Sequence, residues 1–359
     1  MDPRIREHAE VVVDHSTRVE AGDNVVINGS PQAEDLVVAI AELCGERGAV
    51  IDTALGSDRV QRAYSRAIDE DDVTLNEMAR ARYEQADVLI NVRANRNVNE
   101  ASDVPPAKTA AMGRANKPIQ DIVMDKRWNA TQFPAPGDAQ NAEMSTEAYA
   151  DFVFSAVNKD WDAVREHQDQ LVELLDGADE VHVVSGETTD VTMSIAGNVV
   201  QNDYGEHNMP GGEVFTAPVP DSVEGEVLFD KPVMVQGREV LDVRLVFEDG
   251  EVVEHEAAKN EEVLTSLLET DDGARRLGEL GIGMNRDIDR FTYNMLFDEK
   301  MGDTVHMAIG MAYGDTVGED NERNDSAVHT DMIVDMSEDS FIEVDGERIQ
   351  EDGTFVFEE

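Results

Sequence analysis

Two apolar segments near the C-terminal end of the sequence each contain one histidine. The first reads V-H-M-A-I-G-M-A-Y-G-D from Val305, and the second reads V-H-T-D-M-I-V-D from Val328. Both patterns are typical of β-strands, so we expect two strands joined by the acidic loop between them. His329 and Asp331 are two residues apart and should therefore point to the same face. An imidazole and a carboxylate that converge from paired strands could bind a divalent transition metal ion.

The same residues could also be ordinary histidines of a half-buried sheet, because a His-x-Asp triplet is common. In the first strand His306 should share a face with Ala308, while Met307 and Ile309 point into a core. The choice between a structural and a metal-binding interpretation therefore depends on other residues.

Three glutamates upstream stand in unusual surroundings. Glu213 follows a Gly-Gly turn in N-M-P-G-G-E-V-F-T-A-P, and glycines there let backbone come close to whatever the carboxylate holds. Glu279 lies among small and apolar residues in L-G-E-L-G-I-G-M-N, where a carboxylate is either paired or binds a ligand. Glu299, in F-D-E-K-M-G-D, precedes His306 by seven residues. Glu213 could instead be a solvated glutamate after a turn, since the chain has 78 acidic residues.

The charge of the chain is extreme for a sequence that contains 41% hydrophobic residues over 359 positions. The formal net charge is −49, and the acidic residues are spread along the whole sequence. Such a chain repels itself unless salt screens it, so we expect a protein from a salt-accumulating cytoplasm, as in a halophilic archaeon. The charge argues against nucleic acid as a partner, since phosphates need a basic face. An acidic protein that binds calcium or cationic partners is the alternative.

Cys44 is the sole cysteine, which excludes a disulfide framework and a thiolate metal cluster. No basic segment followed by an apolar run opens the sequence, and no 18-residue apolar stretch occurs. These patterns predict a soluble, cytoplasmic protein without membrane association.

The first half of the chain alternates strands and helices, which predicts a mostly parallel sheet in an α/β domain. The turn after the first strand reads N-G-S-P-Q and lacks the glycine pattern of dinucleotide-binding folds. The segment 127–140 is expected to be irregular, either a linker, which we favour, or a loop that lines a site. The predicted elements are helices over 3–16, 33–44, 75–85, 107–116, 145–154 and 162–175, and strands over 24–28, 49–52, 87–92 and 119–124.

From about residue 179 short strands alternate with Gly, Asp, Asn and Pro turns, which is typical of antiparallel sheets. Helices are predicted over 260–268 and 274–280, before the two histidine strands. The expected fold class is therefore α/β plus α+β. An N-terminal α/β domain (1–177) should be followed by an antiparallel, β-rich catalytic domain (178–359).

Several long blocks of the sequence resemble, in order and spacing, the M29 family of metallo-aminopeptidases (aminopeptidase T and aminopeptidase S type). These blocks are N-M-P-G-G-E-V-F-T-A-P, L-G-E-L-G-I-G-M-N, L-F-D-E-K-M-G-D-T-V-H-M-A-I-G-M-A-Y and V-H-T-D-M-I. The segment R-W-N-A-T-Q-F-P-A-P-G-D-A-Q-N-A-E-M-S is also similar, so the resemblance covers nearly the whole chain.

The resemblance implies an aminopeptidase that releases N-terminal residues from peptides with free N-termini, and a homodimer. It implies two divalent ions per chain, and nitrogen and oxygen ligands suit Zn²⁺, Co²⁺ or Mn²⁺ alike. The implied metal ligands are Glu213, Glu279, Glu299, His306, His329 and Asp331.

The resemblance also places Tyr313 at the active site, where it could donate to the developing oxyanion. Either Glu279 or Glu299 could accept the proton of the attacking water. The segment between Glu299 and His306 is two residues longer than in the bacterial enzymes, so Glu299 is the least secure ligand. A shorter loop over 314–328 could alter access to the site. A hydrolase of another amide or ester bond and a non-catalytic binding protein are the alternative functions.

Overall fold

The computed structural model describes residues 2–235 and 237–358, which form two compact units. The first unit comprises Met1–Lys159 and Gly205–Gly211, and the second comprises Asp160–Tyr204 and Gly212–Glu359. The predicted boundary between residues 177 and 178 lies after helix α8 (Trp161–Leu175), which belongs to the second unit.

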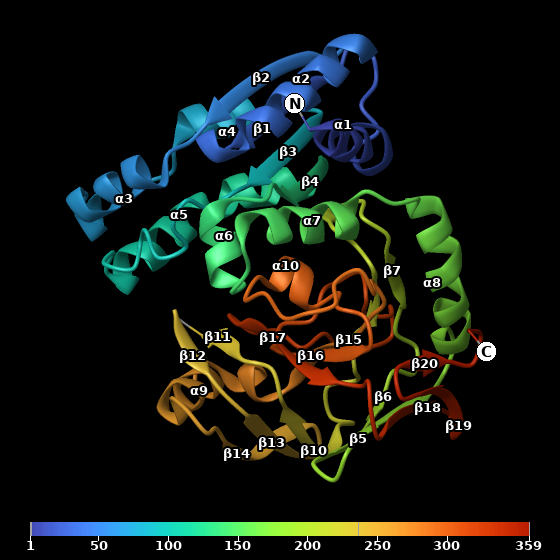
Figure 1. The fold of residues 1–359 in the computed structure, drawn as a ribbon. Helices are drawn as coiled ribbons and strands as arrows, with labels where there is room; N and C mark the ends of the chain where they lie inside the picture. The colour runs from blue at the N-terminus through green and yellow to red at the C-terminus, as the bar shows by residue number, and fades with distance from the viewer. Residues whose placement is uncertain (1, 236, 359) are drawn as a thin grey trace. The chain divides into compact units, whose positions relative to one another are not determined.

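The first unit contains a five-stranded sheet in the order β2-β1-β3-β4-β8, and every neighbouring pair in it is parallel. Figure 1 shows this sheet among the helices of the unit. The strands are β1 (Asn24–Gly29), β2 (Val50–Leu55), β3 (Val88–Arg93), β4 (Arg127–Gln132) and β8 (Asn208–Met209). The helices are α1 (Pro3–Glu10), α2 (Glu34–Arg47), α3 (Asp58–Ala67), α4 (Glu77–Glu84), α5 (Pro106–Met124), α6 (Pro136–Asn141) and α7 (Thr146–Val157).

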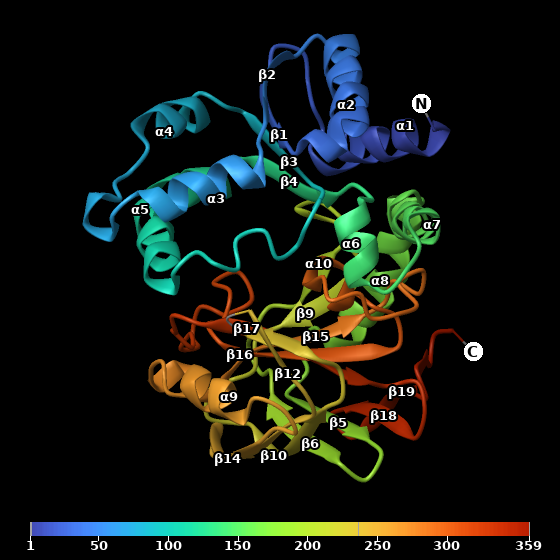
Figure 2. The same ribbon diagram turned by 60° about the vertical axis from the view of Figure 1, so that its left-hand side comes forward.

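Helices cover both faces of this sheet. Alternate residues of a strand point to opposite faces, and here apolar residues on both faces are buried. Val25 and Ile27 pack into a core with residues of α1 and α2, whereas Val26 packs on the opposite face with Leu89. Figure 2 shows the same sheet from a second direction. The predicted α/β architecture is therefore confirmed for this part of the chain.

Three local predictions in this unit were wrong. Residues 119–124, predicted as a strand, belong to α5, which continues through Pro118. The apolar residues Ile119, Ile122 and Val123 have the spacing of one helix face, and this outweighed the proline. The fourth strand is β4, inside the segment predicted to be irregular. Helix α3 was not predicted, although Val60, Ala63, Tyr64 and Ala67 have the spacing of one helix face.

The second unit contains two large antiparallel sheets that enclose a common core, together with the two-stranded sheet β11-β12. One has eight strands in the order β14-β13-β10-β6-β5-β18-β19-β20, and the other has five in the order β17-β16-β15-β9-β7. Core residues come from both, among them Val183 and Leu245 from the first sheet and Leu280 and Met307 from the second. We call the five-stranded sheet the site sheet, because its outer face carries the candidate site.

The strands of the site sheet are β7 (Gln201–Asp203), β9 (Glu213–Thr216), β15 (Leu277–Gly283), β16 (Thr304–Gly310) and β17 (His329–Asp335). The eight-stranded sheet comprises β5 (Glu180–Ser185), β6 (Thr189–Ser194), β10 (Glu224–Phe229), β13 (Val243–Glu248), β14 (Glu251–Glu256), β18 (Ser340–Val344), β19 (Glu347–Glu351) and β20 (Thr354–Phe355). The remaining elements include β11 (Val233–Val235), β12 (Arg238–Val240), α9 (Glu261–Leu268) and α10 (Met295–Asp298).

The predicted antiparallel, β-rich second half is confirmed, with one correction that affects the site. Residues 274–280 were predicted as a helix. Residues 274 and 275 instead belong to a short 3₁₀ turn, and residues 277–280 are the first part of β15, the central strand of the site sheet. Both neighbours of β15 are strands, and this tertiary pairing outweighed the local pattern. In the part of the chain that the structure describes, no helix is both long and apolar enough to cross a membrane.

Candidate metal centre

The site sheet presents one face to the core and collects acidic residues and histidines on the other. Along β16, Val305, Met307 and Ile309 enter the core, whereas His306 lies on the opposite face. Met332 and Val334 of β17 also enter the core. The alternation predicted for the two histidine strands is therefore confirmed.

A β-bulge in β15 directs Glu279 to the outer face. The pairing with β16 shifts by one residue between Leu277 and Glu279, so that Leu277 stays in the core while Glu279 lies opposite Ala308. Gly278 is the extra residue, and a Cβ atom there would lie 2.3 Å from the carbonyl oxygen of Gly310. Only glycine fits at this position, and the sequence L-G-E thereby determines where the carboxylate points.

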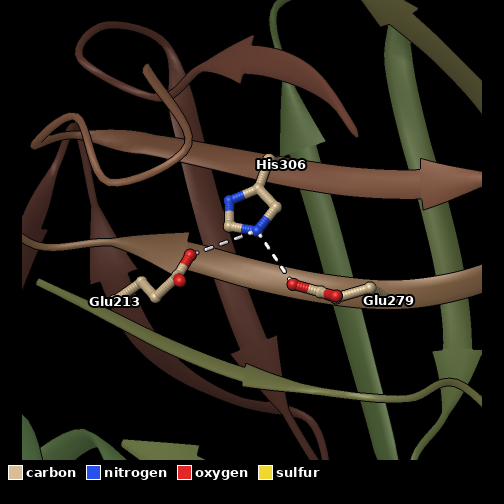
Figure 3. A group of neighbouring side chains, drawn as sticks. All are labelled: Glu213, Glu279 and His306. Carbon is tan, nitrogen blue, oxygen red and sulfur yellow. Dashed lines mark hydrogen bonds and ion pairs between the residues drawn. The ribbon is translucent and has the colours of Figure 1, made fainter. Parts of the chain in front are cut away.

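The first cluster of possible metal ligands comprises Glu213, Glu279 and His306, all buried (Figure 3). His306 Nε2 lies 3.4 Å from Glu213 Oε2 and 3.2 Å from Glu279 Oε1. These three side chains come from the adjacent strands β9, β15 and β16.

Gly281 makes room for the imidazole of this first cluster. It pairs with His306 across the sheet, and a Cβ atom at Gly281 would lie 2.1 Å from both Cε1 and Nε2 of the ring. The ring therefore lies across the backbone of β15, with Nε2 near the two carboxylates.

The second cluster comprises Glu279, His329 and Asp331. His329 Nε2 lies 3.5 Å from Glu279 Oε2 and 3.5 Å from Asp331 Oδ1. His329 Nδ1 lies 2.7 Å from the carbonyl oxygen of Met311. A carbonyl only accepts, so Nδ1 carries the proton and donates it, and Nε2 is left to face the carboxylates.

Glu279 belongs to both clusters, and its two oxygens face different imidazoles. Within the described residues, Glu213 Oε2, Glu279 Oε2 and His306 Nδ1 are buried and form no hydrogen bond. Buried carboxylate oxygens without donors are costly, unless a cation binds them. The donor set of carboxylates and imidazoles fits divalent ions such as Zn²⁺, Co²⁺ and Mn²⁺.

With no ion bound, the site retains protons. Burial raises the pKa of Glu213 to about 8, although the charge of Lys300 opposes this shift. Burial alone would lower the pKa of His306, but its hydrogen bond to Glu279 and the charge of Glu213 raise it to about 9. Burial would likewise lower the pKa of His329, but Asp331 and Glu279 raise it to about 9.

Tyr313 lies at the edge of the second cluster. Its ring centroid is 4.8 Å from that of His329 and 6.5 Å from that of Phe215, and the side chain is partly exposed. Burial and the negative charges of Glu279 and Asp331 raise the pKa of the phenol above its usual value. The hydroxyl therefore keeps its proton and is available as a donor.

Glu299 lies outside both clusters, next to Lys300. Glu299 Oε1 contacts the ammonium of Lys300, which is also 3.0 Å from Glu213 Oε1. Glu213 and Glu299 are close to each other, because both carboxylates contact this ammonium. No sequence pattern singles out Lys300, because it stands beside two acidic residues in L-F-D-E-K-M, as a solvated lysine would.

The structure also shows a supporting glutamine that no sequence pattern indicated. Gln168 of α8 is fully buried, and its Nε2 donates to the carbonyl oxygens of Glu213, at 2.8 Å, and Asp203, at 3.1 Å. These bonds hold the start of β9 against β7, and thereby hold the backbone that carries Glu213.

The family model described as "Thermophilic metalloprotease (M29)" matches residues 1–359. The chain belongs to the M29 family. Among curated M29 relatives, Aminopeptidase 2 of Geobacillus stearothermophilus is 29% identical over 99% of this chain and 98% of its own. Aminopeptidase T of Thermus aquaticus is 30% identical over 97% of this chain and 95% of its own.

Solved structures agree with the M29 assignment. Wild-type AmpT from Thermus thermophilus superposes with a TM-score of 0.87 and 25% identity, covering 99% of both chains. The 2,5-dihydroxypyridine dioxygenase of Pseudomonas putida has a TM-score of 0.63 at 14% identity, over 98% of this chain and 96% of its own. This second similarity concerns the fold alone, and a fold by itself does not decide the reaction.

The tight packing of His306 on Gly281 predicts that Gly281→Ala in this M29 enzyme displaces the imidazole from Glu213 and Glu279. We expect the affinity for divalent ions, measured by calorimetry, to fall by about tenfold or more. Gly45→Ala is the control, because a Cβ atom at Gly45 meets nothing within 4 Å. Unchanged metal affinity in Gly281→Ala would contradict the placement of the ring.

The raised pKa values of His306 and His329 predict that metal binding to the M29 site strengthens with pH. Both rings hold a proton below about pH 9 when no ion is bound, and only the neutral ring binds a metal. The apparent affinity should therefore rise between about pH 6.5 and about pH 8.5 by up to about tenfold per pH unit for each proton displaced. Calorimetry in buffers of different ionisation enthalpy counts these protons, and an affinity independent of pH would contradict the prediction.

Proposed function

We propose that this metal-dependent aminopeptidase removes N-terminal residues from peptides by means of two divalent ions held on the outer face of the site sheet. The observation that carries the proposal is the position of Glu279, whose two oxygens face His306 and His329 separately. One ion would be held by Glu213, Glu279 and His306, and the other by Glu279, His329 and Asp331. All of these residues lie within 178–359, which supports the assignment of that region as the catalytic domain.

Two divalent ions at this place would supply an activated water and polarise the scissile carbonyl group. The side chains then have to remove a proton from the water and stabilise negative charge on the substrate. Glu279 is predicted as a ligand or as the proton acceptor, but as a ligand of both ions it would have no oxygen left for a proton. Glu299 lies beside Glu213 and outside both clusters, which favours Glu299 as the proton acceptor over a role as sixth metal ligand.

In this proposal Tyr313 donates its hydroxyl proton to the developing oxyanion. It lies next to His329 and is partly open to solvent, so a substrate carbonyl can reach it. Because its pKa is raised, the phenol is a donor throughout the neutral range.

Metal coordination supports a substrate with a free amino terminus. One of the two ions could bind the nitrogen of a free amine, whereas an acylated nitrogen is a poor ligand. A hydrolase of another amide or ester bond would lack this preference, and a non-catalytic binding protein would need no bound metal.

We further propose a cytoplasmic homodimer from a salt-accumulating organism, such as a halophilic archaeon. The net charge of −49 supports the salt requirement, and Zn²⁺, Co²⁺ and Mn²⁺ are all compatible with the ligands.

The decisive test of the function compares an aminoacyl-anilide with its N-acetylated form, at high salt and after reconstitution with Zn²⁺, Co²⁺ or Mn²⁺. We expect cleavage of the free amine only, together with close to two ions per chain by mass spectrometry. Equal cleavage of both compounds would contradict the requirement for a free amine. A chain that binds no ion after reconstitution would support the non-catalytic alternative.

Tyr313→Phe should lower kcat by about 10²–10³-fold, as expected for the loss of one oxyanion donor, while the metal content stays intact. The removed hydroxyl is not a member of either ligand cluster. Tyr64→Phe, at an exposed tyrosine of α3, is the control. Loss of metal in Tyr313→Phe would refute the proposed role.

Low salt should unfold the chain or dissociate the dimer, because the screening length grows from about 3 Å at 1 M salt to about 10 Å at 0.1 M. Circular dichroism and light scattering along a salt series measure the two effects. Full activity and an unchanged oligomeric state in dilute buffer would contradict the salt requirement.

A further inference from the structure

Lys300 is a fully buried lysine that contacts three carboxylates beside the candidate metal centre. Its Nζ lies 3.0 Å from Glu213 Oε1 and 3.7 Å from Asp203 Oδ2, and it donates to Glu299 Oε1. The backbone is also fixed, since Lys300 N donates to the carbonyl oxygen of Phe297 and Lys300 O accepts from Asn285 N. A buried ammonium is tolerated only where such partners exist.

Three carboxylate partners compensate the positive charge of the buried ammonium. This positive charge lies 3.0 Å from Oε1 of Glu213, a member of the first ligand cluster.

The ammonium of Lys300 contacts both Glu213 and Glu299, and it affects the two carboxylates differently. It occupies Oε1 of Glu213 and leaves Oε2, which lies 3.4 Å from His306 Nε2 and forms no hydrogen bond within the described residues. It also holds Glu299, which contributes to neither ligand cluster.

We propose that Lys300 is a positioning residue that limits Glu213 to one metal-binding oxygen and keeps Glu299 out of the ligand set, as the proton acceptor. The inference rests on the proposed two-metal function and adds to it the means by which ligand and base are separated.

The charges of the site agree with this role. Five carboxylates are linked by these contacts, and one ammonium with two divalent ions balances their charge when both imidazoles are neutral. The carboxylates are Asp203, Glu213, Glu279, Glu299 and Asp331.

The test compares Lys300→Gln, Glu299→Gln and the double variant with the parent enzyme, by kinetics and by Co²⁺ titration. In Lys300→Gln the second oxygen of Glu213 and the carboxylate of Glu299 become free to bind metal, and a repelling charge is gone. We expect Co²⁺ to bind at least as tightly as in the parent, while kcat falls by about 10–100-fold and KM changes by less than about twofold.

The double variant shows whether Lys300 acts through Glu299. If it does, Glu299→Gln with Lys300→Gln should be no slower than Glu299→Gln alone, because the second change removes a partner that has already lost its function. The double variant also keeps the experiment interpretable if Lys300→Gln alone folds poorly, since it removes the ammonium and one half-buried carboxylate together. Lys300→Arg, which keeps the charge, should recover part of kcat.

A merely structural lysine would behave differently. In that case Lys300→Gln would lose Co²⁺ in proportion to its activity. Alternatively, the decreases in kcat caused by Lys300→Gln and by Glu299→Gln would multiply in the double variant. Either result would overturn the proposal. Lys231→Gln is the matched control, because Lys231 pairs with Asp335 at 2.8 Å outside the site and its loss should leave kcat unchanged. A parent that binds two ions and cleaves the free amine keeps the proposed function intact even if the role of Lys300 fails.

Discussion

Buried negative charge on one face of a sheet is the constraint on which the rest of this structure depends. Glu213, Glu279 and Asp331 lie on three strands of the site sheet around His306 and His329, and Glu213, Glu279 and His306 are buried. Without counterions such an array would repel itself and take up protons, as the raised pKa values of Glu213 and Glu279 indicate. The outer face of the site sheet is therefore suited to bind cations, which would balance this negative charge.

The second unit is built to hold this array rigidly. The opposite face of the same strands packs into a hydrophobic core shared with the eight-stranded sheet, and this core fixes the strand register. Glycines then adjust the outer face, since Gly278 turns Glu279 outward and Gly281 admits the ring of His306. The parallel sheet of the first unit follows different rules, with helices on both faces and no need for alternating polarity.

Much of the site could be predicted from the sequence, because strand alternation is local. The face shared by His329 and Asp331, and the core positions of Met307 and Met332, follow from a period of two. The resemblance of long blocks to a known family supplied the glutamates, and Glu213 and Glu279 do lie beside the histidines. Secondary structure failed where local patterns were ambiguous, at Ile119–Met124 and at Ala274–Leu280, since pairing with neighbouring strands or packing of a helix face decided the outcome.

The sequence by itself determined the fold class and the family and predicted candidate metal ligands, because hydrophobic periodicity and ordered sequence blocks can be recognised without a structure. Only the tertiary structure decided how those candidate residues are arranged. That Glu279 faces both imidazoles, that Glu299 stands apart, and that the ammonium of Lys300 lies between Glu213 and Glu299 all depend on strands brought together from distant parts of the chain. Distances between side chains set the electrostatic balance of a buried site, and no spacing along the sequence contains them.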